Sequence, residues 1–282
     1  GGFIGAEPLP APTAGSGGSA STGGSAGTGG TTSPGTPTAG TGSTSGSGGT
    51  AAPAPAPYVP TSLGTLTAAG TVLNDGGKIF AGGPVTLNTP QINNAGGSLS
   101  VASMAVTGPT FSNAGGTLNV SNSFSANVGQ LDNTGGTLNA GSLDIATTGD
   151  LVNIDGKLTS ATDATLTVGG HTDNTRGTIS ATGALTANVT GAIDNTAGTL
   201  ASNQALTLAG QSLNNSQGNI ASASGNVQAT IGQQLLNTDG HIASGANLTI
   251  QTGSLEGTEG SLQSTGDLNV TAAQGLTSTG TN

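Results

Sequence analysis

From about residue 61 onwards, apolar and polar residues alternate in short stretches, and the alternation returns roughly every 20 residues. One apolar position of this repeat holds Leu138, Leu158, Ile179, Leu200, Ile220, Ile242 and Leu262. A second is a pair spaced by two, such as Leu143 and Ile145, and a third lies two residues before an asparagine. Spacing by two buries one face of a strand, and three such stretches per copy leave no room for a helix. The pattern predicts an all-β chain with three short strands in each copy.

Each copy is marked by an asparagine that is followed by glycine three positions later and by Leu or Ile five positions later. Nine asparagines have this pattern, from Asn74 to Asn237, and a tenth copy has Gly257 in the asparagine position. Asn is favoured at the first position of a type I turn and Gly at the fourth, where we expect a left-handed residue. The candidate structural residues are Asn94, Gly97, Asn113, Gly116, Asn133, Gly136, Asn153, Gly156, Asn174, Gly177, Asn195, Gly198, Asn215, Gly218, Asn237 and Gly240.

Copies of this length with three strands each predict a parallel β-solenoid, in which each strand pairs with its equivalent about 4.8 Å away. About ten 20-residue rungs over residues 61–282 would form a rod on the order of 45 to 50 Å long. We expect the stacked asparagine amides to hydrogen-bond from rung to rung, as stacked Asn side chains do in cross-β structures.

Composition changes this picture for the first part of the chain. Residues 6–57 are almost entirely Gly, Ser, Thr, Ala and Pro, and Glu7 is their only charge. Such a segment has too little apolar surface to offset the entropy lost on ordering. We therefore predict a disordered low-complexity linker over residues 1–60, followed by the solenoid over residues 61–282.

The balance of charge excludes several classes of partner. The chain has 3 Lys+Arg, 13 Asp+Glu and a net charge of -10. Nucleic acids and anionic membranes are bound by clustered cations, so we expect neither. No apolar run approaches the roughly 18 residues of a spanning helix, so we expect no membrane insertion by this segment. The N-terminus lacks an initiator Met and a basic leader, and Leu276 has the frame of a further corner, so we expect a fragment or processed form of a longer protein.

Candidate catalytic residues are few and dispersed. Lys78, Lys157 and His241 each follow a turn glycine and should point outward, but they lie in rungs one, five and nine. Four rungs correspond to roughly 19 Å, which is too far for one site of acid and base catalysis. The third cation, Arg176, cannot by itself complete such a site. We therefore expect no enzyme activity and no cofactor.

Candidate metal ligands are equally sparse. Asp132, Asp173, Asp194 and Glu256 all precede a corner, and a Ca²⁺ ion between Asp173 and Asp194 is one interpretation. The glycine- and aspartate-rich nonapeptide of calcium-binding β-rolls is absent, which favours two exposed like charges screened by solvent. His171 has no partner at metal-ligand spacing, so we interpret it as a loop residue. We expect no metal site.

The period, the N-x-x-G-x-L/I signature and the background of Ser, Thr, Asn and Gly resemble a known family. They are similar to the haemagglutinin repeats of filamentous haemagglutinin and of contact-dependent growth inhibition exoproteins, which Gram-negative bacteria export by two-partner secretion. The resemblance covers about residues 61–282. It implies a right-handed parallel β-helix, an outer-membrane secretion barrel as a partner, and a secreted or cell-surface location. The implied role is a virulence-associated stalk or adhesive surface that extends binding or toxin regions towards a host or neighbouring cell receptor.

Departures from the family leave alternatives open. The chain has no Asn-Pro dipeptide, as found in the secretion domain of the family, and no VENN motif. The second interpretation is a β-helical passenger of an autotransporter-like adhesin that binds host glycan or protein. The third is a polysaccharide-cleaving β-helix enzyme. A lectin would normally present aromatic platforms, yet only Phe80, Phe111 and Phe124 follow Tyr58, and two of them have an inward frame. This favours a scaffold.

Overall fold

The computed structural model describes residues 66–68 and 70–280, so the expected linker over residues 1–60 lies outside the described residues. Within the described ranges the regular secondary structure is β-strand, with no helix. The strands are β1 (Leu66–Ala68), β2 (Val72–Leu73), β3 (Lys78–Asn88), β4 (Gln91–Asn93), β5 (Ser98–Ser112), β6 (Thr117–Asp132), β7 (Thr137–Thr147), β8 (Leu151–Val152), β9 (Lys157–Ser160), β10 (Ala164–Val168), β11 (Thr172–Asp173), β12 (Thr178–Ala181), β13 (Leu185–Val189), β14 (Ala192–Asp194), β15 (Thr199–Ser202), β16 (Leu206–Gly210), β17 (Ser212–Asn214), β18 (Asn219–Ser222), β19 (Val227–Leu236), β20 (His241–Ser244), β21 (Leu248–Glu256), β22 (Ser261–Ser264) and β23 (Leu268–Thr277).

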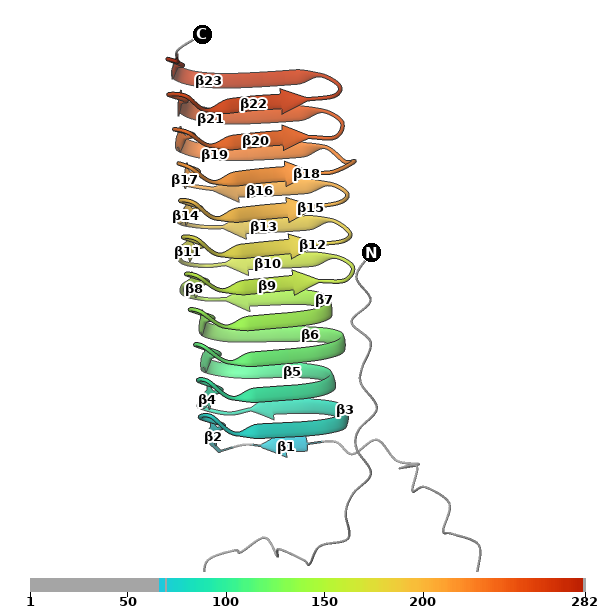
Figure 1. Cartoon of the computed structure of the whole chain (residues 1–282). Helices are drawn as coiled ribbons and strands as arrows, with labels where there is room; N and C mark the ends of the chain where they lie inside the picture. The colour runs from blue at the N-terminus through green and yellow to red at the C-terminus, as the bar shows by residue number, and fades with distance from the viewer. Residues whose placement is uncertain (1–65, 69, 281–282) are drawn as a thin grey trace, which may run out of the picture. The chain divides into compact units, whose positions relative to one another are not determined.

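The strands stack as a continuous coil, and Figure 1 follows it from β1 to β23. Every pairing is parallel and joins a strand to its equivalent one rung later. In rungs five to seven, for example, Leu158 pairs with Ile179 and Ile179 pairs with Leu200. Each rung therefore places an inward residue directly above and below its equivalents. The sequence-based prediction of a parallel β-solenoid with about ten rungs is confirmed.

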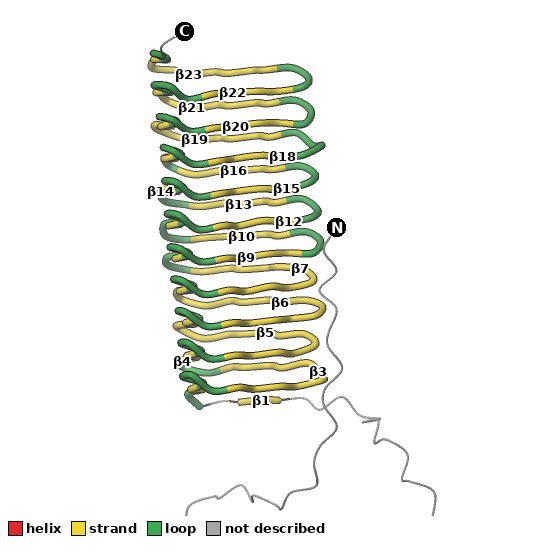
Figure 2. The backbone as a smooth tube through the Cα atoms, in the orientation of Figure 1, coloured by secondary structure: helices red, strands yellow, loops and turns green. Residues whose placement is uncertain are grey.

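The asparagine turn is the first corner of each rung, and the second corner follows the next short strand, as between Ser160 and Ala164. The structure of this second corner differs between two parts of the solenoid. In the first four rungs the strand continues through this corner, as in β3, β5, β6 and β7. From β9 onwards a loop interrupts it, and Figure 2 shows the corresponding bends changing from strand to loop. The prediction of three separate strands per copy therefore holds best for rungs five to seven, where β9 to β17 form three strands per rung.

The core is a stack of aliphatic side chains along the axis of the coil. Leu138 and Leu158 pair in consecutive rungs, as do Ile145 and Leu166, and all four are fully buried. A buried side chain of this size contributes about 1.5 to 3 kcal/mol through removal of apolar surface from water. Because a single rung cannot cover its own apolar side chains, this contribution requires the stack. The inward frame predicted from spacing is thus observed.

Aromatic residues occur in the second and third rungs of this core. Phe111 and Phe124 are buried, and their ring centroids lie 5.9 Å apart with the planes tilted by 37°. Phe80, by contrast, is 72% exposed on the first rung. The side chains of the tenth rung are covered from one side only, so Leu268 and Leu276 remain about half exposed.

Candidate functional site

The asparagine turns are the most regular feature of the described chain. In each full N-x-x-G turn the glycine N–H donates to the asparagine C=O, for example Gly136 to Asn133 at 2.9 Å and Gly198 to Asn195 at 3.0 Å. The left-handed residue is the third of the four. It is Gly76, Gly96, Gly115 or Gly135 in the first four turns and Asp155, Arg176, Ala197, Gln217, Asp239 or Glu259 in the later ones, all with φ between 53° and 62°. The expectation that the fourth residue is left-handed was wrong.

The glycine at the fourth position is required by close approach instead. A Cβ on Gly198 would overlap the backbone carbonyl oxygen of Asn174 in the preceding rung and lie 2.7 Å from Asn195 Oδ1. The same overlap with the preceding asparagine applies to Gly97, Gly116, Gly136, Gly156, Gly177, Gly218 and Gly240. A partner 24 residues earlier in the chain therefore explains this glycine, and local turn conformation does not.

The buried asparagines form a directional ladder. In each of eight steps, Nδ2 of one asparagine donates to Oδ1 of the asparagine in the next rung at 2.6 or 2.7 Å. The members are Asn74, Asn94, Asn113, Asn133, Asn153, Asn174, Asn195, Asn215 and Asn237. Each side chain has at most 6% of its surface exposed, so these bonds satisfy polar groups that water cannot reach. The amide ladder expected from the sequence is present.

The ladder stops where the repeat degenerates. Gly257 occupies the asparagine position of the tenth copy, so Asn237 donates only to the backbone carbonyls of Gly240 and Ser261, at 3.1 and 3.3 Å. The turn itself persists, because Gly260 N–H still bonds to the Gly257 carbonyl. The ladder is thus separable from the turn that carries it.

A second set of buried polar side chains lies at the second corner, and the sequence interpretation missed it. Ser160, Ser202 and Ser244 are buried, and each hydroxyl donates to a backbone carbonyl two or three residues later at 2.7 or 2.8 Å. Ser222 occupies the same column and donates to the Gln204 carbonyl. A signal existed, since each serine lies two residues after an inward Leu or Ile and is itself in the inward frame.

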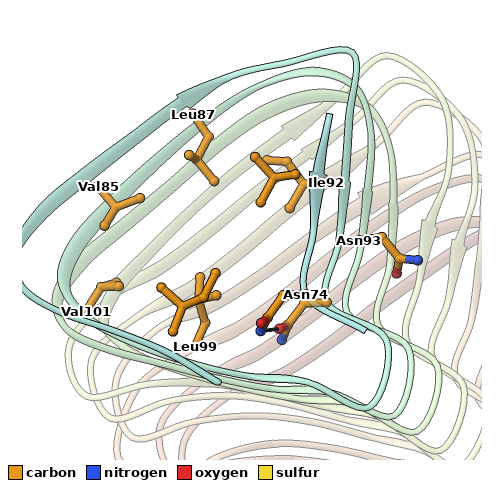
Figure 3. Close-up of a pocket in the computed structure, with 10 residues that line it drawn as sticks. Asn74, Val85, Leu87, Ile92, Asn93, Leu99 and Val101 are labelled. Carbon is orange, nitrogen blue, oxygen red and sulfur yellow. Dashed lines mark hydrogen bonds between the residues drawn. The ribbon is translucent and has the colours of Figure 1, made fainter. Parts of the chain in front are cut away.

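The apolar cavity at the start of the coil is too small to be a ligand site. Its lining includes Val85, Leu87, Ile92 and Leu99, and Figure 3 shows these aliphatic side chains around it, with the Asn74 amide at one side. The cavity has a volume of about 10 Å³. A single water needs roughly 10 to 15 Å³ and several polar partners, so this space is a packing gap.

The cationic side chains stay apart, as expected. Lys78 and Lys157 are exposed in one outward column, with three intervening rungs between them. His241 is exposed further along the same column, and its Nδ1 lies 2.6 Å from Ser261 Oγ. The structure therefore brings no two of these three side chains into one site.

Arg176 forms the ion pair found among the described residues. Its Nε and Nη2 each lie 2.7 Å from an oxygen of Asp155, which occupies the equivalent left-handed position one rung earlier. The hydrogen bond from Arg176 lowers the pKa of Asp155, and the pKa of Arg176 is raised in return. Any stabilisation from this pair is present at neutral pH and is lost as the pH falls through the lowered pKa of Asp155. Because both side chains are exposed, solvent screening keeps it small.

Three of the four acidic residues that precede a corner cap their own turns. Asp132 Oδ1 accepts the N–H of Thr134 and Asp194 Oδ1 that of Thr196, both at 2.9 Å. Asp173 does the same for Thr175 and pairs in register with Asp194 of the next rung. Over the described ranges no group of three His, Cys, Asp or Glu side chains is close enough to hold a metal ion.

His171 lies at the third corner, between β10 and β11, where it is hydrogen-bonded to both adjacent rungs. Its imidazole Nδ1 accepts a hydrogen bond from the backbone N–H of Ala192 at 2.9 Å. The backbone N–H of His171 donates to Asp150 Oδ1 at 2.8 Å. Both bonds bridge to a residue 21 positions away, one rung earlier or later. The imidazole Nδ1 is thus bonded to the backbone of the next rung.

The described part of the chain contains no helix of the length and apolar character needed to cross a membrane.

Of three comparisons with known proteins, the one with protein-family models found a match. Neither the curated proteins nor the solved structures contain a match. A family model described as the haemagglutinin repeat matches four times, at residues 61–105, 102–155, 153–227 and 222–281. The matches together cover the whole coil of asparagine turns and most of the 282 residues. The chain belongs to the haemagglutinin repeat family.

Proposed function

We propose that the solenoid is a structural stalk segment of a large secreted surface exoprotein of the filamentous haemagglutinin type. The observation that carries this proposal is that the same buried ladder and inward side chains recur in rung after rung, while charged side chains are scattered over the outside. A repeat of this kind specifies length and stiffness and does not single out one binding position. The stalk would extend or present binding or toxin regions.

Export by two-partner secretion through an outer-membrane barrel is the matching proposal for its route. Membership of the haemagglutinin repeat family supports it. The composition is also compatible, because the chain has no Cys and only 6% charged residues, so neither crosslinks nor strongly hydrated side chains oppose passage as an unfolded thread. The location would be the exterior of the bacterial cell.

An adhesive surface for host glycan or protein is the second candidate. It is supported by the outward columns of β10 and β13, where Thr165, Thr167 and Asn188 are exposed and offer hydroxyl and amide groups. A polysaccharide-cleaving enzyme ranks third, since Lys78 and Lys157 lie four rungs apart and Arg176 is paired with Asp155.

Beads coated with the 282-residue chain would separate the first two candidates. The stalk proposal expects binding to host cells and to a glycan array no greater than that of albumin-coated beads. Saturable binding that soluble chain competes away would replace the stalk proposal with the adhesive one. The enzymatic candidate is checked by incubating the chain with a panel of polysaccharides, where new reducing or unsaturated ends would support it.

A further inference from the structure

The dipeptide Asp-Gly occurs twice at the same place in the asparagine turn. Asp155–Gly156 and Asp239–Gly240 occupy the third and fourth positions of their turns, and both aspartates are exposed and left-handed, with a φ of 53°. A further Asp-Gly dipeptide, Asp75–Gly76, lies one position earlier in its turn, so it is not equivalent. The two later dipeptides share one backbone conformation at the aspartate and can therefore be compared directly.

An aspartate that precedes a glycine can rearrange the backbone between the two residues. The glycine nitrogen attacks the protonated side-chain carboxyl group, a C–N bond forms at the carboxyl carbon, and the hydroxyl leaves with the N–H proton as water. Water then opens the resulting cyclic imide at one of its two carbonyl groups. One opening restores aspartate, and the other gives isoaspartate, in which the main chain is longer by one methylene group. Glycine favours the reaction because it has no side chain that obstructs the attack.

Arg176 restrains the carboxyl group of Asp155 in two ways. Its Nε and Nη2 each bond a different carboxyl oxygen at 2.7 Å, so the carboxyl group cannot turn towards the Gly156 nitrogen without losing these bonds. The same hydrogen bonding lowers the pKa of Asp155, so less of the reactive protonated form is present at a given pH. Both effects oppose the rearrangement at this turn.

In the part of the chain that the structure describes, Asp239 has no cation of this kind. The residues at the equivalent left-handed position are Gln217 one rung earlier and Glu259 one rung later. Within residues 66–68 and 70–280, the ion pair that is found joins Arg176 to Asp155 and does not involve Asp239. No guanidinium group therefore holds the Asp239 carboxyl group away from the nitrogen of the following glycine.

The turn around Asp239 is also held less firmly than the turn around Asp155. The Gly240 nitrogen lies 3.2 Å from the Asn237 carbonyl oxygen, whereas the corresponding distance from the Gly156 nitrogen is 3.0 Å. Asn237 is the last member of the ladder, so its amide donates to backbone carbonyls and to no further asparagine. Weaker closure of the turn leaves the Gly240 nitrogen freer to approach the carboxyl group.

We propose that Asp239–Gly240 is a site of spontaneous isoaspartate formation, and that Arg176 protects the equivalent site at Asp155–Gly156. Water is the one co-reactant. Gly240 lies so close to the Asn215 carbonyl of the preceding rung that no Cβ fits between them. A turn lengthened by a methylene group must therefore separate the two rungs. The modification would limit the lifetime of the solenoid, beginning at the ninth rung.

Incubation of the complete chain in water enriched in oxygen-18, at mildly acidic pH and physiological temperature, tests the proposal. Each passage through the imide places one oxygen-18 atom in the new carboxyl group, whether the product is aspartate or isoaspartate. Peptide mass spectrometry locates the label, and electron-transfer fragmentation distinguishes the two products. We expect the label at Asp239 first, and at Asp155 less than about half as fast, because the ion pair favours the unreactive carboxylate.

Substitutions in the left-handed column separate the effect of the guanidinium group from that of the turn. Arg176→Ala should raise the labelling rate at Asp155 at least about twofold, because two charge-assisted bonds are lost. The rate at Asp239 in the same molecule is the internal control and should not change. Glu259→Arg places a guanidinium group one rung after Asp239 and should slow labelling there. Glu259→Gln is the matched control, which removes the same negative charge and should slow labelling less.

Several outcomes would overturn the proposal. Absence of label at Asp239, or equal labelling of Asp155 and Asp239 in the unaltered chain, would show that Asp239 is not the vulnerable site. An unchanged rate at Asp155 in Arg176→Ala would mean that the ion pair gives no protection. A rise at both aspartates in that variant would assign the effect to general loosening of the solenoid.

Discussion

Each of the first nine rungs contains one buried asparagine of the ladder. Asn174 has no exposed surface, accepts from Asn153 Nδ2, and donates to Asn195 Oδ1 and the Thr199 carbonyl. Its removal leaves Asn195 Oδ1 without its donor, while Asn153 Nδ2 loses the amide acceptor and keeps only the Gly156 and Thr178 carbonyls. A buried group without a partner costs its full desolvation penalty, which is larger than the net gain from the bond.

Asn174→Ala is therefore expected to lower the free energy of unfolding by about 2 to 4 kcal/mol. Urea denaturation followed by circular dichroism measures the loss. Asn139→Ala is the matched control, because its amide makes one bond to Asn119 Oδ1 at 3.0 Å on the outside of the solenoid. That variant should change stability by at most about 0.5 kcal/mol. Equal losses of stability for the two variants would show that a buried bond of the ladder stabilises the chain no more than an exposed amide bond does.

At the scale of the element, the turn separates two roles of glycine that are adjacent in the sequence. The third residue has a left-handed φ but free space around it, as at Gly135, and side chains such as that of Ala197 are accommodated there. The fourth residue has an ordinary φ but no room for a Cβ, because the preceding rung lies against it. Backbone conformation constrains one position and inter-rung contact constrains the other.

Alanine substitutions at the two positions should therefore differ. Gly135→Ala should cost only about 1 to 2 kcal/mol, the usual penalty of a left-handed residue. Gly198→Ala must displace backbone, and a loss of about 3 kcal/mol or more is expected. Thermal or urea denaturation of both variants side by side makes the comparison. A larger loss of stability for Gly135→Ala would mean that backbone conformation constrains the turn more strongly than contact with the preceding rung does.

For the molecule as a whole, stability is shared between neighbouring rungs and is not concentrated in one globular core. Each interior rung is covered on both sides, whereas the tenth is covered on one, which leaves Leu268 and Leu276 about half exposed. In such a linear array, local opening should begin at the ends and cost most in the middle.

Limited digestion with a protease of broad specificity should accordingly yield one resistant core. We expect it to begin between Pro57 and Leu66 and to end near Thr277, because the paired strands protect the backbone between these limits. Mass spectrometry of the fragments identifies both ends. Cleavage at asparagine turns throughout the chain would contradict stacking of the rungs in isolation, and the stalk proposal would then apply only to a longer parent.

Much of this structure could be predicted from the sequence because the governing interactions repeat. Alternation by two identified the inward side chains of Leu131, Leu138 and Ile145, and the period of about 20 residues aligned them from rung to rung. The asparagine ladder followed from the same alignment. The column of buried serines at Ser160 and Ser202 was missed, because their partners are backbone carbonyls whose positions depend on the shape of the corner.

The sequence by itself determined the period, the inward faces and the positions of the turns, since these depend on residue spacing along a strand. Only the tertiary structure decided why the fourth turn residue is glycine and which turn residue is left-handed. It also decided how Arg176 meets Asp155 and where the second corner breaks the strand. These features depend on contacts between residues about 20 positions apart, and such contacts exist only once one rung lies 4.8 Å or so from the next.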